Sequence, residues 1–275
     1  MGATLGASSY GKAEVRVVRI DRDSPRHEIT DLDVDVALGG DLEDSHLHGD
    51  NAHVLPTDTM KNTVYALARD GVGGIESFGE RLARHFVDTQ PPIHTARVRL
   101  RRHPWERVGP HSFSRGEGGE VRTAEVSYDG STVSVWAGLR DLLLLNSTDS
   151  EFTGFAVDEY TTLEPTTDRI LATAVTATWR YADTSGDLAE AYTAAREGLV
   201  SAFADTYSLA LQQTLYAMGE RVLDRVPAVA EVLLALPNRH HFLVDLAPFG
   251  RDNPGEVFHA ADRPYGLIEG TVKRT

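Results

Sequence analysis

Four short polar segments carry the side chains best suited to chemistry in this chain. A lysine ends Ser9-Tyr10-Gly11-Lys12, just before the first expected strand, and Thr57-Asp58-Thr59-Met60-Lys61-Asn62 opens an expected helix. Asp168-Arg169 precedes a long expected strand, and Asn238-Arg239-His240 interrupts another. Amine, hydroxyl, guanidinium and imidazole groups can hold an anion and move protons, so these segments are candidate parts of a site.

A histidine cluster offers a different chemistry. His46, His48 and His53 lie close together in the sequence among acidic residues. A His-x-His spacing on a strand places both imidazoles on one side, as metal binding requires. The neighbouring Gly49-Asp50-Asn51 has the composition of a turn instead. A zinc site therefore stays open as an alternative to a metal-free site.

The composition excludes several kinds of site. The chain has 275 residues and no cysteine, which rules out disulfides, thiolate nucleophiles and cysteine-held metal clusters. Its formal net charge is −14, whereas nucleic-acid binding needs clustered Lys and Arg, so we expect no nucleic-acid partner. No apolar run approaches the about eighteen residues of a membrane helix, so we expect no membrane partner. Gly71-Val72-Gly73-Gly74 lacks the preceding strand that a dinucleotide-binding turn needs.

Hydrophobic periodicity predicts which elements position these segments. In the first half, the pattern predicts strands at Ala13–Ile20 and Ile29–Leu38, helices at Thr59–Arg69 and Ile75–Val87, and strands at Thr95–Arg102 and Val121–Tyr128. In the second half, it predicts strands at Val133–Leu145 and Ile170–Tyr181, helices at Asp187–Asp205 and Ser208–Val226, and strands at Val232–Leu236, His241–Leu246 and Tyr265–Lys273. The first two of these last three strands, Val232–Leu236 and His241–Leu246, could be one long interrupted strand.

The element order is therefore β-β-α-α-β-β, written twice, with a change-over near Asp129-Gly130. Helices bunched between antiparallel strands indicate an α+β fold, with residues 1–130 as the first unit and 131–275 as the second. In each unit the helices would cover one face of the sheet and leave strand edges exposed. We therefore expect an oligomer.

The four polar segments, in this order and spacing, resemble the urate oxidase family. The resemblance covers nearly the whole chain from Tyr10 onward, and its most specific parts are Thr57–Asn62, Phe152–Arg169 and Asn238-Arg239-His240. It implies two tandem tunnelling-fold units, assembled as a homotetramer that encloses a barrel-like tunnel with active sites between subunits. The implied enzyme is an oxidoreductase of purine degradation. It oxidises urate with molecular oxygen and water to 5-hydroxyisourate and hydrogen peroxide, without a cofactor or metal.

The resemblance also implies roles for matched residues. Lys12 and Thr57 correspond to the family's catalytic pair, and a lysine can act as a base only when it is neutral. His240, beside Asn238, would complete the proton path. The residues implied to bind substrate are Thr57, Asp58, Phe152, Arg169, Leu211, Gln212 and Asn238.

Each implied substrate contact has its own chemistry. Arg169 would grip urate with its planar fork, and the Gln212 amide would meet the opposite edge of the ring. Phe152 would stack on the purine face, and Leu211 would form a wall of the pocket. Thr57 and Asp58 would offer backbone N–H groups at the helix start. Asn238, with Thr57, would form the small site for oxygen or water.

Taken singly, these residues also have ordinary structural explanations. Lys12 could be an exposed cation at a strand end, Thr57 or Asp58 a helix N-cap, and Gln212 a solvated helix residue. Arg169 could form a salt bridge, while His240 and Phe152 could be core residues. Three other functions stay open: a zinc-dependent pterin-pathway enzyme of the same fold, a non-catalytic purine binder and a structural oligomer. The final Lys273-Arg274-Thr275 is not a peroxisomal signal, so we expect a cytoplasmic, bacterial-type protein.

Overall fold

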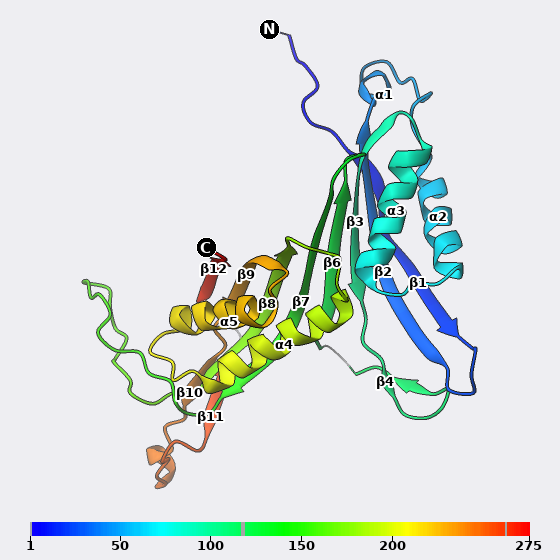
Figure 1. Ribbon diagram of the computed structural model, residues 1–275. Helices are drawn as coiled ribbons and strands as arrows, with labels where there is room; N and C mark the ends of the chain where they lie inside the picture. The colour runs from blue at the N-terminus through cyan, green and yellow to red at the C-terminus, as the bar shows by residue number, and fades with distance from the viewer. Residues whose placement is uncertain (1, 117–118, 262) are drawn as a thin grey trace. The chain divides into compact units, whose positions relative to one another are not determined.

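The computed structural model describes residues 2–116, 119–261 and 263–275, and it divides into two compact units (Figure 1). Unit 1 comprises Met1–Gly138 with Thr184–Ala189, and unit 2 comprises Leu139–Asp183 with Glu190–Thr275. The division after Gly138 falls inside a strand, β7 (Val133–Asn146), which contains residues of both units. The two compact units divide the chain after Gly138, whereas the sequence repeat divides it at residue 130. The boundary at residue 130 therefore stays a prediction.

Unit 1 is an antiparallel sheet covered by helices. Its strands follow the order β1-β2-β3-β6, with bounds β1 (Tyr10–Asp21), β2 (Glu28–Gly40), β3 (Ile93–Arg102) and β6 (Val121–Tyr128). The helices are α1 (Glu43–Leu47), α2 (Thr57–Arg69) and α3 (Ile75–Thr89), and α2 and α3 lie against the sheet (Figure 1). A small hairpin of β4 (Glu106–Arg107) and β5 (Phe113–Ser114) follows β3.

The core of unit 1 follows from the two periodicities. Phe78, Leu82 and Phe86 recur every four residues along α3, and all three are fully buried. Val34 and Val36 alternate along β2 and are buried in the same cluster. One helix stripe and one strand face therefore meet in a single apolar layer, as the sequence predicts.

Unit 2 repeats this arrangement. Its strands follow the order β8-β9-β12, with bounds β8 (Leu171–Tyr181), β9 (Val229–Pro237) and β12 (Leu267–Lys273). The helices are α4 (Leu188–Asp205) and α5 (Leu211–Arg225), and α5 lies against β9 and β12 (Figure 1). Tyr192, Ala195, Leu199 and Phe203 of α4 are buried, as are Leu215, Met218 and Val222 of α5.

The α+β class and the repeated β-β-α-α-β-β order are confirmed. Two details differ. The second long helix begins at Leu211 rather than Ser208, because Ser208 bonds through its backbone to the segment at Asp149–Glu151. The segment after β9 does not continue that strand: β10 (His240–Leu243) pairs with β11 (Phe258–Ala261) in a separate two-stranded sheet, with the short 3₁₀ helix η1 (Ala247–Phe249) between them.

One sheet edge is open in each unit. Among the described residues, β1 pairs only with β2, and β12 pairs only with β9. Such edges present unpaired backbone groups that another chain can complete. None of the described helices is both long and apolar enough to cross a membrane.

Gly219 is predicted to be essential for the close packing of α5 on β12. A Cβ at this position would lie 2.5 Å from Val272 Cγ2 and 3.3 Å from Leu234 Cδ1. Gly219→Ala should therefore overpack this layer and lower stability by about 1–3 kcal/mol, which thermal unfolding will register as a lower Tm. Gly186→Ala is the matched control, since a Cβ there meets nothing within 4 Å. Equal Tm values for the two variants would contradict the packing argument.

Candidate active site

Unit 2 contains a pocket of about 500 Å³ at the junction of three segments. These segments are the long loop between β7 and β8, the break between β9 and β10, and the hairpin of β10 and β11. Four predicted site residues line the pocket together: Phe152, Arg169, Asn238 and His240. Sequence positions nearly ninety residues apart thus converge on one cavity, at about the volume of a small-molecule site.

Arg169 is the one arginine or lysine among the described residues that line this pocket, which Glu164 and Asp168 also line. Its side chain is half-buried, and burial lowers the pKa of the guanidinium below its ordinary value. The Nε–H donates to Ser150 Oγ at 3.2 Å, and the backbone N–H donates to Ser150 O at 2.9 Å. Within the described part of the chain, no carboxylate forms an ion pair with Arg169, so the salt-bridge explanation fails. The guanidinium therefore remains available to an anionic ligand.

Phe152 supplies an aromatic face beside this cation. The guanidinium carbon of Arg169 lies 5.3 Å from the centre of the Phe152 ring. The ring stacks on Phe155 with centres 5.0 Å apart and planes 13° apart. Two backbone hydrogen bonds with Thr166, of 2.8 and 3.1 Å, hold Phe152 in place. A flat apolar surface and a planar cation thus share one pocket.

Asn238 and His240 occupy the break between β9 and β10. The backbone N–H of Asn238 donates to Gly266 O at 2.7 Å, and Asn238 forms an isolated bridge with Thr173 of β8. His240 begins β10 and stacks on Phe242 with ring centres 5.7 Å apart. The backbone that carries each side chain is therefore paired with a neighbouring strand, Asn238 with β8 and His240 with β11.

Leu211 and Gln212 are the first two residues of α5. Leu211 is only 3% exposed, whereas Gln212 is exposed, and neither lines the pocket. Their helix start is joined to the pocket loop through the isolated bridge between Ser208 and Ser150. The roles of Leu211 as a wall and Gln212 as a ligand contact stay predictions.

Lys12 lies in unit 1, on β1 beside an irregularity of the strand. It lines a pocket of about 320 Å³ together with Asp35, Arg97 and Arg99. The register of β1 and β2 shifts between Lys12 and Val15, and Glu14 adopts a positive φ of 56°. The Glu14 N–H donates to Asp35 Oδ1 at 2.6 Å. A bulge of this kind redirects the side chains beside it, so it contributes to the placement of Lys12.

Gly11 and Tyr10 fix the chain just before Lys12. A Cβ on Gly11 would lie 1.8 Å from Val36 O, so only glycine permits this approach of the two strands. Tyr10 OH donates to Leu55 O at 3.1 Å, which ties β1 to the segment that leads into α2. Burial raises the pKa of the Tyr10 phenol, although the hydrogen bond to Leu55 opposes this.

Thr57 and Asp58 open α2 in the same unit. The N-cap is Pro56, which makes no side-chain cap hydrogen bond, so the N-cap explanation for Thr57 or Asp58 is wrong. The helical hydrogen bonds begin with Met60 N to Pro56 O at 3.3 Å, which leaves earlier N–H groups without an acceptor inside the helix. A hydrogen bond from Lys61 lowers the pKa of Asp58, and the charge of Lys12 adds to this effect.

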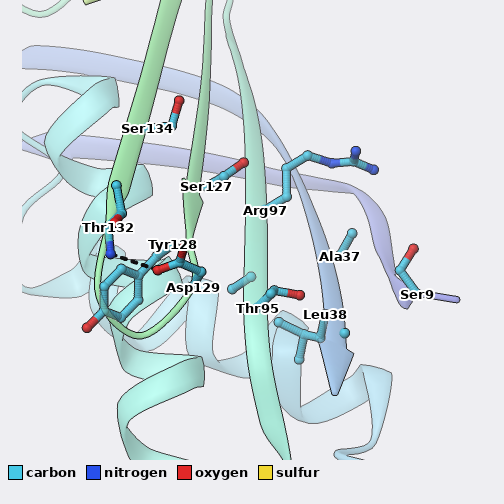
Figure 2. Close-up of a pocket in the computed structure, with 12 residues that line it drawn as sticks. Ser9, Ala37, Leu38, Thr95, Arg97, Ser127, Tyr128, Asp129, Thr132 and Ser134 are labelled. Atoms are coloured by element: carbon cyan, nitrogen blue, oxygen red, sulfur yellow. Dashed lines mark hydrogen bonds between the residues drawn. The ribbon is translucent and has the colours of Figure 1, made fainter. Parts of the chain in front are cut away.

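A second pocket of unit 1, of about 330 Å³, contains none of the predicted site residues (Figure 2). Small hydroxyl side chains line much of it, and Thr132 N donates to Asp129 Oδ1 at 2.7 Å. Figure 2 shows Arg97 directed away from Asp129. The arrangement is a shallow, largely apolar surface on the strands and lacks convergent charged groups.

The histidine cluster does not converge in the structure. His46 lies in α1, where its Nδ1 contacts Leu42 O at 2.8 Å, and His48 and His53 lie outside that helix. Among the described residues, no group of three or more His, Asp or Glu side chains is arranged to hold a metal ion. The geometry gives the zinc alternative no support.

Comparison with known proteins shows what this arrangement is similar to. The sequence profile of the uricase family matches residues 8–132 and 135–269. Uricase of Arthrobacter globiformis is 53% identical over 272 residues, which span 98% of this chain and 90% of the relative. The chain belongs to the uricase family.

Solved uricase structures agree in fold. The crystal structure of the Arthrobacter globiformis uricase matches with a TM-score of 0.97 at 52% identity, covering 100% of this chain and 96% of that chain. Urate oxidase from Bacillus sp. TB-90 matches with a TM-score of 0.85 at 27% identity, covering 98% of this chain and 100% of that chain. The predicted fold of two tandem tunnelling-fold units is confirmed.

Sequence reasoning missed several residues of the uricase-family pocket in unit 2. Leu163, Phe242 and Phe258 line it, and Ser150 holds Arg169. Phe258 belongs to β11, a short strand whose periodicity gives no signal. Ser150 could have been suspected, because it stands in the same short block as Phe152.

The strained backbone of the bulge beside Lys12 should be measurable in the free energy of unfolding. Because Glu14 adopts a left-handed backbone conformation, Glu14→Gly should relieve strain and raise the free energy of unfolding by about 1 kcal/mol. Ala13→Gly, at an exposed neighbour with an ordinary φ, should lower it by about 0.5–1 kcal/mol. Denaturant titration measures both. Equal destabilisation by the two changes would show that Glu14 is not strained.

Proposed function

We propose that this chain is a urate oxidase that needs no metal or organic cofactor. Membership of the uricase family supports urate as substrate and molecular oxygen as oxidant. The observation that carries the proposal is the unit 2 pocket, which unites an aromatic face, an amide, an imidazole and a guanidinium that has no ion pair among the described residues. This is the set of groups that a planar, hydrogen-bonding anion requires.

The reaction balances with these reactants alone. Urate gives up two electrons and oxygen accepts them, together with two protons, to become hydrogen peroxide. Water adds at the oxidised ring and supplies the hydroxyl oxygen of 5-hydroxyisourate. The protein must therefore deprotonate urate, hold it flat and keep oxygen and water close to the ring.

Substrate binding is assigned to unit 2 residues. Arg169 grips one edge of the urate anion with its fork, and Gln212 meets the opposite edge with its amide. Phe152 stacks on the ring face, and Leu211 forms a wall. The Arg169 geometry supports this assignment, because its charge forms no ion pair among the described residues.

Proton transfer is assigned to Lys12, Thr57 and His240. Thr57 relays a proton from urate to Lys12, while His240 beside Asn238 moves protons on the other side of the ring. Asn238 and Thr57 hold oxygen or water, and the N–H groups at Thr57 and Asp58 bind the substrate. The bulge next to Lys12 and the start of α2 at Thr57 support these roles.

A homotetramer follows from the same proposal. The open edges of β1 and β12 favour pairing with other copies of the chain, which closes the sheets into a barrel around a tunnel. The active sites then lie between subunits, with Lys12 and Thr57 of one subunit facing Arg169 and Gln212 of another.

The assay that tests the proposal uses metal-stripped protein and urate in air. Urate absorbance, oxygen uptake and peroxide are followed together. Equal consumption of urate and oxygen, with peroxide appearing, is the expected result. Oxidation that starts only after a metal is restored, or urate binding without oxygen uptake, would refute the cofactor-free oxidase.

Lys12→Met separates catalysis from binding. The variant keeps most of the apolar stem but loses the amine, so turnover should fall at least about a hundredfold, the usual worth of a general base. Affinity for urate under nitrogen should stay within about threefold, because the binding residues are unchanged. Lys273→Met, at an exposed lysine 3.4 Å from Glu231, should leave turnover within about twofold. Equal losses in the two variants would remove Lys12 from the mechanism.

A further inference from the structure

Ser150 occupies an unusual position behind the pocket. Its side chain is fully buried, although most of the surrounding loop is exposed. Its hydroxyl accepts from Arg169 Nε–H at 3.2 Å, and its backbone carbonyl accepts from Arg169 N–H at 2.9 Å. Arg169 is therefore held by one serine through both its backbone and its side chain.

Ser208 ties this serine to the start of α5. The two serines form a parallel bridge, in which Glu151 N donates to Ser208 O at 2.8 Å and Ser208 N donates to Asp149 O at 2.9 Å. Asp149 adopts a positive φ of 58° at this bridge. The loop that carries Arg169 is thus pinned to the segment just before the helix that carries Gln212.

A buried hydroxyl pair continues the connection into α5. Thr214 Oγ1 donates to Ser208 Oγ at 2.8 Å, and both side chains are fully buried. Thr214 lies in the first turn of α5, two residues after Gln212. A buried hydroxyl destabilises a fold unless it is hydrogen-bonded. Loss of either hydroxyl of this pair would leave the other without this partner, so the two side chains depend on each other.

Arginine binds planar anions well only when its fork is already oriented. The bond from Nε to Ser150 uses one donor of Arg169 and leaves both terminal NH₂ groups for a ligand. Loss of the bond would let the long side chain sample other rotamers, and ligand binding would then have to order it again.

We propose that Ser150 is a positioning residue that orients Arg169, and that the bridge from Ser150 to Ser208 and Thr214 sets the spacing between Arg169 and Gln212. The inference rests on the proposed function, since it takes urate as the ligand that these two side chains grip. The substrate is touched by none of these three residues, Ser150, Ser208 and Thr214. Each acts through the side chain that it holds.

The test is a double-mutant cycle on urate affinity, measured under nitrogen so that oxidation does not interfere. Ser150→Ala should raise Kd about tenfold in the wild-type background, the order of magnitude of one hydrogen bond to a charged group. In an Arg169→Gln background the same change should alter Kd by less than about twofold, because the residue it orients is gone. In air, Ser150→Ala should raise KM about tenfold and leave kcat within about threefold.

Two further comparisons separate positioning from general stability. Ser201→Ala is the matched control: Ser201 also accepts from an arginine, Arg221 Nη1 at 3.3 Å, but lies outside the pocket. Its Kd should not change. Thr214→Val should weaken urate binding several-fold, whereas Thr214→Ser, which keeps the hydroxyl, should restore it. This pair tests the connection even where Ser150→Ala fails to fold.

The outcomes distinguish this inference from the proposed function. Equal effects of Ser150→Ala in both backgrounds would overturn the positioning role while leaving urate oxidation intact. Wild-type protein that binds urate, shows the predicted coupling but consumes no oxygen would overturn the oxidase and keep the positioning role. Wild-type protein that does not bind urate would overturn both.

Discussion

The pocket of unit 2 depends on one constraint: the charge of Arg169 is held half-buried in a partly apolar cavity. A cation in a partly apolar cavity loses solvation, and the lowered pKa of Arg169 reflects that cost. A serine hydroxyl and an aromatic ring lie beside it, and although Glu164 and Asp168 line the same pocket, no carboxylate of the described residues forms an ion pair with it. The long loop before β8 supplies Ser150 and Phe152, and the break after β9 brings Asn238 and His240 to the same cavity. A bound anion would complete the set.

A different constraint governs unit 1, where Lys12 must lie on a strand that is not regular. Gly11 lets β1 approach β2 closely, and the bulge at Glu14 changes the register immediately after the lysine. The bond from Tyr10 to Leu55 then couples this strand to the start of α2, where Thr57 stands. A strained residue and a close approach of two strands thus lie beside Lys12, as is common at functional sites.

Much of the fold could be predicted from hydrophobic periodicity, because the apolar residues of a long amphipathic element mark the face that it buries. Phe78, Leu82 and Phe86 mark α3, and the alternation of β2 is as clear. Among the short elements, the strand predicted at His241–Leu246 overlaps β10, but α1 and β11 were not predicted, because β11 is defined by its pairing with β10 rather than by a pattern of its own. For the site, the resemblance to the urate oxidase family pointed to Arg169 and His240, but Ser150 is tied to Ser208 by a backbone bridge that no local pattern encodes.

The most direct test of the central claim is a crystal structure of the protein with urate bound under nitrogen. The account predicts urate in the unit 2 pocket, with its edge on Arg169, its face on Phe152 and Lys12 of a neighbouring copy on the opposite side. Urate bound instead in the shallow pocket of unit 1 that contains Arg97 and Asp129, or at the histidines near α1, would contradict it.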